Sequence, residues 1–206
     1  MKIGVLGGTF DPIHVGHLII AEEVRVRLGL TQVLFVPAWI SPLKLARLLS
    51  PAEDRVRMLE LAIASNPYFR LSRVDIERPG PSYSVDTLRE LRAELGPRAQ
   101  IFFIMGADAV IELPTWRDPK TILDLCQVVG VLRPGCESFD PASLDGLIPG
   151  AARRILMLDV PAIGISASAI RARISLGLSI RYLVPEAVER YIYERGLYDM
   201  RTVAEG

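Results

Sequence analysis

Two histidines, three residues apart, follow a pair of glycines near the start of the chain. Residues 7–17 read GGTFDPIHVGH, and His14 and His17 are the only histidines in the sequence. Gly7 and Gly8 have no Cβ, so a phosphate can approach the backbone closely at this point. The spacing of three predicts that both imidazoles lie on one face of a helix's first turn and, with its free N–H groups, point at one anion. Two histidines alone could also bind a metal, but no third ligand lies nearby.

A second phosphate-binding pattern lies near the C-terminus, in the segment ISASAIRARI over residues 165–174. Ser166 and Ser168 are both suitable N-cap residues, and Arg171 falls in the first turns of the helix that follows. Because the N–H groups of a helix start and a planar guanidinium can converge on one anion, this is a candidate phosphate site. Taken alone, the pattern fits equally an ordinary capped helix with a solvent-facing arginine.

The elements that must position these two motifs alternate along the chain. Short apolar runs predict strands, and so does the alternation of apolar and polar residues over 68–76. The predicted strands cover residues 3–6, 32–38, 68–76, 100–105, 127–132 and 155–160. Apolar residues at helical spacing predict helices, and these cover residues 15–28, a helix that starts at Pro51, and residues 85–95, 118–125, 168–176 and 186–195. For the helix at Pro51, Ser50 is the expected N-cap and Glu53 the capping-box residue. Residues 134–150 are rich in Pro, Gly, Ser and Asp, which predicts a surface loop.

Alternating strands and helices predict a doubly wound, Rossmann-like α/β fold with a parallel sheet covered on both faces. We expect one domain over residues 1–206, with a small C-terminal helical part over residues 165–200. Ligands of such folds bind beyond the carboxyl ends of the strands. The segment 7–17, between the first strand and the first helix, falls at that edge.

Composition limits the classes of protein to be considered. The 206 residues are 50% hydrophobic and 23% charged, which excludes a disordered or fibrous chain. The 24 Lys and Arg balance the 24 Asp and Glu, so no net charge attracts nucleic acid or an anionic membrane. Cys126 and Cys136 are too few for a disulfide framework, and Cys126 is expected to be buried. Without a recognisable signal peptide or apolar span, we expect a soluble cytoplasmic protein.

The first motif resembles the H-x-G-H signature of a superfamily of nucleotidyltransferases, and the second resembles its ISSTxIR motif. Here Ala167 replaces the second serine and Ser168 the threonine, so one hydroxyl is lost. The resemblance implies an ATP site and catalytic roles for His14, His17 and Arg171. It implies the same for Lys44, which lies in PAWISPLK after the second strand and would reach the β- and γ-phosphates. The implied ATP-binding residues are Gly7, Gly8, Thr9, Phe10, His14, His17, Gly106, Ser166, Ser168, Ile170 and Arg171.

Three further segments indicate which acceptor takes the adenylyl group. RPGPSYSVDTL (78–88), GADAVIELPTW (106–116) and SIRYLVP (179–185) resemble the nicotinate-nucleotide adenylyltransferases, in the right order and over most of the chain. That family joins ATP, with Mg²⁺, to nicotinate mononucleotide in NAD biosynthesis. The resemblance implies that Trp116 stacks on the pyridine ring. The implied acceptor-binding residues are Lys44, Ser84, Asp108 and Trp116; Asp86 and Thr87 are expected to support the following helix.

The sequence leaves several alternatives open. The same chemistry on nicotinamide mononucleotide differs only in an amide for a carboxylate, and phosphopantetheine is an acceptor elsewhere in the superfamily. A nucleotide-binding protein without catalysis would tolerate the loss of Arg171 or a histidine, yet all three are present. A nucleic-acid binder would need more than the clusters Arg153-Arg154 and Arg171-Arg173. Whether the chain is a monomer or a homo-oligomer is not readable from the sequence.

Overall fold

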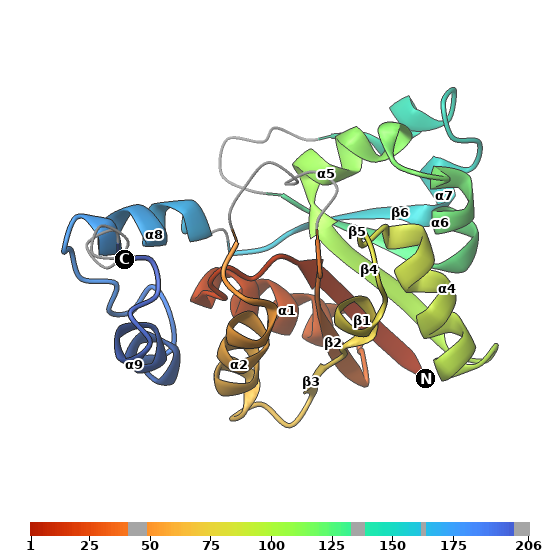
Figure 1. Ribbon diagram of the computed structural model, residues 1–206. Helices are drawn as coiled ribbons and strands as arrows, with labels where there is room; N and C mark the ends of the chain where they lie inside the picture. Colours follow the sequence, from red (N-terminus) through yellow and green to blue (C-terminus); the bar gives the residue numbers. More distant parts are fainter. Residues whose placement is uncertain (41–48, 133–138, 162–163, 200–206) are drawn as a thin grey trace.

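A six-stranded, fully parallel sheet forms the centre of the protein (Figure 1). The computed structural model describes residues 1–40, 49–132, 139–161 and 164–199. The strand order is β3-β2-β1-β4-β5-β6, and the chain reverses direction across the sheet between β1 and β4. The strands are β1 (Lys2–Gly8), β2 (Gln32–Pro37), β3 (Phe69–Leu71), β4 (Gln100–Gly106), β5 (Gln127–Leu132) and β6 (Ile155–Asp159). This is the doubly wound α/β fold that the sequence predicts, and its switch point is where such folds bind ligands.

Helices cover both faces of this sheet. The longer ones are α1 (Val15–Leu28), α2 (Ala52–Ile63), α4 (Ser84–Leu95), α8 (Ala167–Ser175) and α9 (Glu186–Glu194). The shorter ones are α3 (Val74–Glu77), α5 (Ala107–Glu112), α6 (Pro119–Leu125) and α7 (Ala151–Arg154), with 3₁₀ turns η2 (Leu113–Thr115) and η3 (Pro141–Leu144). In Figure 1, α1 and α2 lie on one side of the sheet and α4 and α6 on the other.

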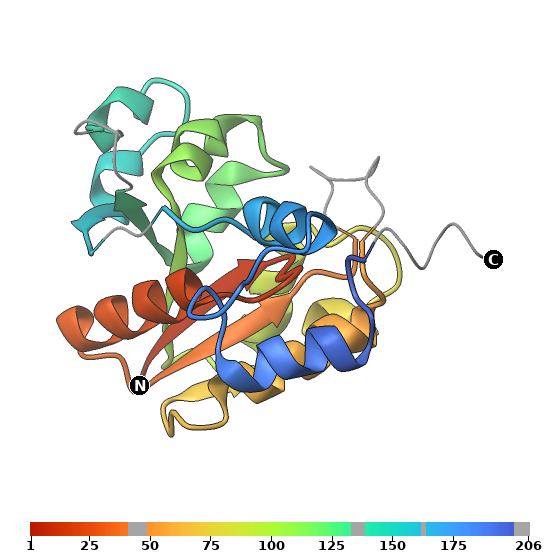
Figure 2. The same cartoon turned by 90° about the vertical axis from the view of Figure 1, so that its left-hand side faces the viewer.

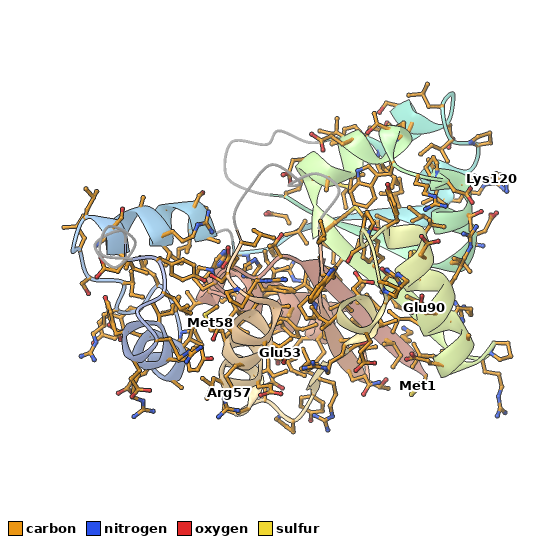
Figure 3. All side chains as sticks on the ribbon, viewed as in Figure 1. Met1, Glu53, Arg57, Met58, Glu90 and Lys120 are labelled. Atoms are coloured by element: carbon orange, nitrogen blue, oxygen red, sulfur yellow. The ribbon has the colours of Figure 1, made fainter. Side chains whose placement is uncertain are left out.

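Each face of the sheet has its own hydrophobic core, because successive strand residues point to opposite faces. In β1, Leu6 packs with α1, α2, α8 and α9, whereas Ile3 and Val5 pack with α4, α5 and α6. Helix α2 has the same division: Met58 is fully buried, while Arg57 is exposed and pairs with Glu60 (Figure 3). The sheet is therefore held rigidly between two layers, and its carboxyl edge is a fixed platform for a site.

Several helix ends agree with the sequence pattern and one does not. Helix α1 covers the predicted residues and ends at Gly29, whose φ of 61° is left-handed and costs glycine little. Helix α2, in contrast, starts one residue later than predicted: Pro51 is the N-cap, and Ser50 makes no cap. Glu53 instead forms an ion pair with Arg73 at 2.6 Å, so the predicted capping box is wrong.

Two segments differ from their predictions. The strand predicted over 68–76 is only Phe69–Leu71, and the chain then turns into α3. The alternation was misleading because Asp75 is buried by ion pairing and not exposed. Residues 107–115, for which no element was predicted, form α5 and η2. Of the predicted loop 134–150, residues 141–144 form η3 and 133–138 lie outside the described residues.

The C-terminal helices pack beside α1 and α2 (Figures 1 and 2). Helix α9 contacts α2, where the Tyr191 hydroxyl donates to the Asp54 carboxylate at 2.7 Å. Further along, the Tyr198 hydroxyl donates to Asp11 Oδ1 at 2.7 Å. The end of the described chain thus reaches back to the first turn after β1. Within the described ranges, no helix is both long and apolar enough to span a lipid bilayer.

Candidate active site

Two cavities meet at the carboxyl edge of the sheet, on either side of the turn after β1. We name them the nucleotide-side and acceptor-side cavities after the two sites that the sequence predicts. The nucleotide-side cavity, of about 280 Å³, lies between residues 8–17 and the start of α8. The acceptor-side cavity, of about 440 Å³, lies between β1, β4 and the start of α4. Gly8, Thr9 and His17 line both. The two cavities thus share one histidine and two positions of the turn after β1, together with the apolar residues Ile20 and Val131.

The two histidine rings stack at the start of α1. His14 is the N-cap of the helix and His17 is its third residue, and their ring centroids are 3.7 Å apart. The backbone N–H of His14 donates to His17 Nδ1 at 3.2 Å. A neutral His17 ring must then carry its proton on Nε2, where it can serve as a donor. The Phe10 ring meets His17 edge-on at 5.0 Å and holds it in place.

The structure corrects one part of the predicted anion site. The backbone N–H of Val15 donates to Leu183 O at 3.0 Å, and that of His17 donates to His14 O. The first bond forms because the residues before α9 pack against the start of α1, and the second lies within the turn itself, so both N–H groups are used within the protein. The imidazoles, and not those N–H groups, are what the turn offers to a ligand.

The glycines of this motif differ in how much room the surrounding atoms leave for a side chain. A Cβ on Gly16 would lie 3.1 Å from His14 Nδ1, and one on Gly8 would lie 3.1 Å from the Phe10 ring. A side chain at either position would therefore press on a ring that belongs to the turn itself. A Cβ on Gly7 would meet only Phe103, at an ordinary 3.6 Å. Packing leaves room for a side chain at Gly7, which lines the acceptor-side cavity.

Helix α8 brings the second motif to the nucleotide-side cavity. Ser166 is the N-cap and accepts from the Ala169 N–H at 3.2 Å, while Ser168 Oγ lies 3.1 Å from Ser166 Oγ. Of the two predicted cap residues, Ser166 is the cap and Ser168 lies within the first turn. Ser166, Ser168 and Arg171 all line the cavity.

Arg171 is fixed by Asp11, a residue to which the sequence assigned no role. Arg171 Nη1 donates to the backbone carbonyl of Asp11, and Asp11 Oδ2 lies 4.0 Å from the same nitrogen. The other nitrogen, Nη2, is buried without a hydrogen-bond partner among the described residues. Buried donors are rarely left unsatisfied, so this nitrogen marks a position for an anionic oxygen.

The acceptor-side cavity combines an aromatic side chain with the start of α4. Ser84 is the first residue of α4, Asp108 is in the first turn of α5, and Trp116 follows η2. All three line the cavity, as do Gly7 and Gly106. Trp116 Nε1 is buried with no hydrogen-bond partner in the described part of the chain.

Trp116 is held against α4 by its neighbour. Arg117 stacks on the Tyr83 ring at 4.8 Å and forms an ion pair with Asp86 at 3.3 Å. Tyr83 is the N-cap residue of α4 and Asp86 lies in its first turn. The tryptophan and the helix start are thus joined, and Asp86 has the supporting role expected for it.

A buried carboxylate lies at the base of the same cavity. Asp75 is only 6% exposed and accepts from Thr87 Oγ1 and Arg78 Nη2, both at 2.6 Å. Burial raises the pKa of Asp75, and the hydrogen bonds from Thr87, Arg78 and Ser82 oppose that rise. The cluster fixes residues 78–87 at both ends. The sequence missed Asp75 because it lies in the wrongly predicted strand.

The sequence-predicted residues thus fall into three sets. The nucleotide-side cavity is lined by Gly8, Thr9, Phe10, His14, His17, Ser166, Ser168 and Arg171. The acceptor-side cavity is lined by Gly7, Gly8, Thr9, His17, Ser84, Gly106, Asp108 and Trp116. Gly7 and Gly106, both predicted for ATP, thus line only the acceptor side, and Ile170 is a fully buried core residue that lines neither cavity. Lys44 lies outside the described residues.

The described ranges contain no group of three or more His, Cys, Asp or Glu side chains that could hold a metal ion.

The chain is similar to known proteins in sequence and in fold. Residues 5–173 match the family described as cytidylyltransferase-like. A probable nicotinate-nucleotide adenylyltransferase of Dehalococcoides mccartyi is 45% identical over 96% of this chain and 97% of its own. One of Thermomicrobium roseum is 46% identical over 98% of this chain and 92% of its own. Among solved structures, the fold resembles Plasmodium falciparum nicotinic acid mononucleotide adenylyltransferase complexed with NaAD, with a TM-score of 0.77, 18% identity and coverage of 96% and 97%.

Proposed function

The chain belongs to the cytidylyltransferase-like family and, within it, to the nicotinate-nucleotide adenylyltransferases, and from that membership we propose that it transfers the adenylyl group of ATP to nicotinate mononucleotide. The products are nicotinate adenine dinucleotide and pyrophosphate. The observation that carries the proposal is the meeting of two cavities at Gly8, Thr9 and His17. A reaction between two phosphorylated substrates needs two sites that share one anion-binding point.

We place ATP in the nucleotide-side cavity, with its phosphates between the histidine pair and α8. Arg171 Nη2 would donate to a phosphate oxygen and so gain the partner that it lacks within the described chain. His17, with its proton on Nε2, would donate to the α-phosphate as negative charge develops there. By resemblance, Lys44 would contact the β- and γ-phosphates.

Nicotinate mononucleotide would occupy the acceptor-side cavity. Trp116 offers a ring face for the pyridine. The start of α4, at Ser84, offers a backbone N–H and the positive end of a helix dipole, which favour a carboxylate over a neutral amide. Asp108, at the carboxyl end of β4, is placed to accept from ribose hydroxyls.

The chemistry is an in-line attack by the acceptor's 5′-phosphate on the α-phosphorus of ATP. The nucleophile is already anionic at neutral pH, so the protein needs no general base and no covalent intermediate. Its contribution is to position two phosphates and to stabilise developing charge. We propose that Mg²⁺ enters as part of the ATP substrate, bound by phosphate oxygens and water.

We also propose that the chain forms one domain in which residues 165–200 complete the ATP site. Three contacts support this: Ser166 and Arg171 line the nucleotide-side cavity, and Tyr198 binds Asp11. A protein truncated after residue 164 would then lose ATP binding together with activity.

The test measures pyrophosphate release from Mg·ATP with three acceptors in parallel: nicotinate mononucleotide, nicotinamide mononucleotide and phosphopantetheine. We expect strong preference for the first. Preference for another acceptor would keep the chemistry and overturn the roles given to Trp116 and Ser84. A folded protein that binds ATP and releases no pyrophosphate with any of them would overturn the proposal in favour of nucleotide binding alone.

A further inference from the structure

Arg55 is a fully buried charged side chain that the proposed reaction does not use. It is 1% exposed and lies on the inner face of α2, on the same stripe as Leu59 and Ala62. Within the described chain, no carboxylate lies within ion-pair distance of it, and burial lowers its pKa. A buried, unpaired guanidinium is costly, so an apolar side chain would serve the core better here.

The guanidinium instead donates hydrogen bonds to four backbone carbonyls. Nη1 donates to Thr9 O at 2.9 Å and to Ala38 O at 2.7 Å, Nη2 to Trp39 O at 3.2 Å, and Nε to Ser50 O at 3.2 Å. These carbonyls belong to the turn after β1, the segment after β2 and the residue just before the α2 N-cap. One side chain therefore joins three segments at the carboxyl edge of the sheet.

Ser82 holds the segment after β2 from the other side. Its Oγ accepts from the Trp39 N–H at 2.9 Å, and its own N–H donates to Ile40 O at 2.9 Å. Its hydroxyl also hydrogen-bonds the buried carboxylate of Asp75. Ser82 lines the acceptor-side cavity two residues before Ser84.

The peptide groups of Trp39 are thus bound from both directions: its carbonyl by Arg55 and its N–H by Ser82. Arg55 also binds Thr9, which lines both cavities, and Ser82 begins the turn that leads into α4. We infer that Arg55 and Ser82 are positioning residues which, through the Trp39 peptide, set the distance between the turn after β1 and the turn before α4. This inference rests on the proposed function, since that distance separates the ATP phosphates proposed beside the turn after β1 from the nicotinate carboxylate proposed at the start of α4.

The test is a double-mutant cycle of Ser82→Ala and Arg55→Lys, with kcat and both KM values measured where circular dichroism finds every variant folded. Ser82→Ala should lower kcat/KM for the acceptor about 10-fold, since displacement by about 1 Å can cost up to about 100-fold. Arg55→Lys cannot keep four planar contacts and should lower kcat by about 10-fold. Because both act on one peptide, the double variant should lose clearly less than the product of the single losses.

Matched variants separate positioning from plain destabilisation. Ser82→Thr keeps the hydroxyl and should keep most of the activity. Arg57→Lys, next to Arg55 but exposed, and Ser143→Ala, whose exposed hydroxyl donates to Asp140 O, should leave all constants unchanged. If Arg55→Lys does not fold, the Ser82→Ala and Ser82→Thr pair decides alone.

Two results would overturn the inference. One is unchanged kinetic constants in Ser82→Ala, and the other is a double-variant loss equal to the product of the single losses. Wild-type adenylyl transfer is measured first, so that its absence, which would overturn the proposed function itself, is not confused with either result.

Discussion

The two cavities that meet at His17 are held in place in opposite ways. On the nucleotide side, the residues come from short continuous motifs, and Arg171 keeps one nitrogen without a partner in the described chain. On the acceptor side, the arginines are matched by carboxylates: Arg78 by Asp75 and Glu90, and Arg117 by Asp86. The first arrangement suits an anion that brings its own charge. The second leaves a ring face and backbone N–H groups, which recognise shape and one small charged group.

This difference indicates what the charged groups of each site do: they contact the ligand directly on one side and position the chain on the other. Arg171 is paired with Asp11 through Nη1, but its Nη2 has no partner in the described chain, so that nitrogen can donate to a phosphate oxygen and stabilise charge in the transition state. Neutralised ion pairs contribute little directly to a ligand, but they fix the chain that does. Substitutions on the nucleotide side should therefore act on kcat, and those on the acceptor side on KM for the acceptor.

The largest effect is expected on the nucleotide side. Replacing His17 or Arg171 by Ala should lower kcat by about 100-fold or more, the usual loss when one donor to a developing charge is removed. Circular dichroism should remain that of the wild type. The control is Arg173→Ala, two residues further along α8, whose side chain donates to Ser179 O away from the cavity. Near-normal turnover in His17→Ala would show that the histidine pair has no role in the reaction.

A smaller and different effect is expected at Trp116. Trp116→Ala should raise KM for the acceptor by about 5- to 10-fold, the loss of one aromatic stacking partner, and leave KM for ATP unchanged. Trp116→Phe keeps a ring face and should fall between the two. If Trp116→Ala changed KM for ATP equally, the two cavities would not be separate substrate sites and the comparison would fail.

The sequence predicts the nucleotide side of the site better than the acceptor side. Helix α1 and the histidine pair were predicted because one continuous segment carries the glycines, the histidines and the apolar spacing. The chain between β4 and α6 was not, since Pro114 and the short turns of α5 and η2 leave no periodic pattern. Its role depends on Arg117 reaching Asp86, 31 residues away in the sequence.

Arg55 and Asp75 were missed for a related reason. The partners of Arg55 are main-chain carbonyls, which every residue type has, so no letter in the sequence identifies them. The one indication in the sequence that Arg55 is buried was its position four residues before Leu59, on the apolar face of α2. Asp75 was read as the exposed position of an alternating strand, whereas ion pairing with Arg78 allows it to be buried. A prediction that relies on the spacing of apolar residues does not find charged side chains that are buried.

The smallest predicted effect concerns the pH dependence of stability on the acceptor side. Burial raises the pKa of Asp75 in the folded protein above its ordinary value. The folded state then holds this proton more tightly than the unfolded state does. The stability that this adds is fully present below the ordinary pKa and is lost as pH rises through the raised value. Arg78, Thr87 and Ser82 face this carboxylate, and Glu90 reaches it through Arg78.

The measurement is the melting temperature of the wild type and of Asp75→Asn from pH 4 upward. Asparagine does not titrate, so the wild type should lose stability relative to the variant as pH rises across this window, and the difference should then level off. The nucleotide side offers a matched control in Tyr198→Phe, which removes a hydroxyl bound to the buried carboxylate of Asp11 and should leave this pH-dependent difference in place. A wild type that gains stability relative to Asp75→Asn over the same range would mean that the hydrogen bonds outweigh burial. The ion pairs of the acceptor side would then stabilise the fold directly. The two cavities would differ in how strongly their charged groups interact, and not in whether those groups bind a ligand or support the chain.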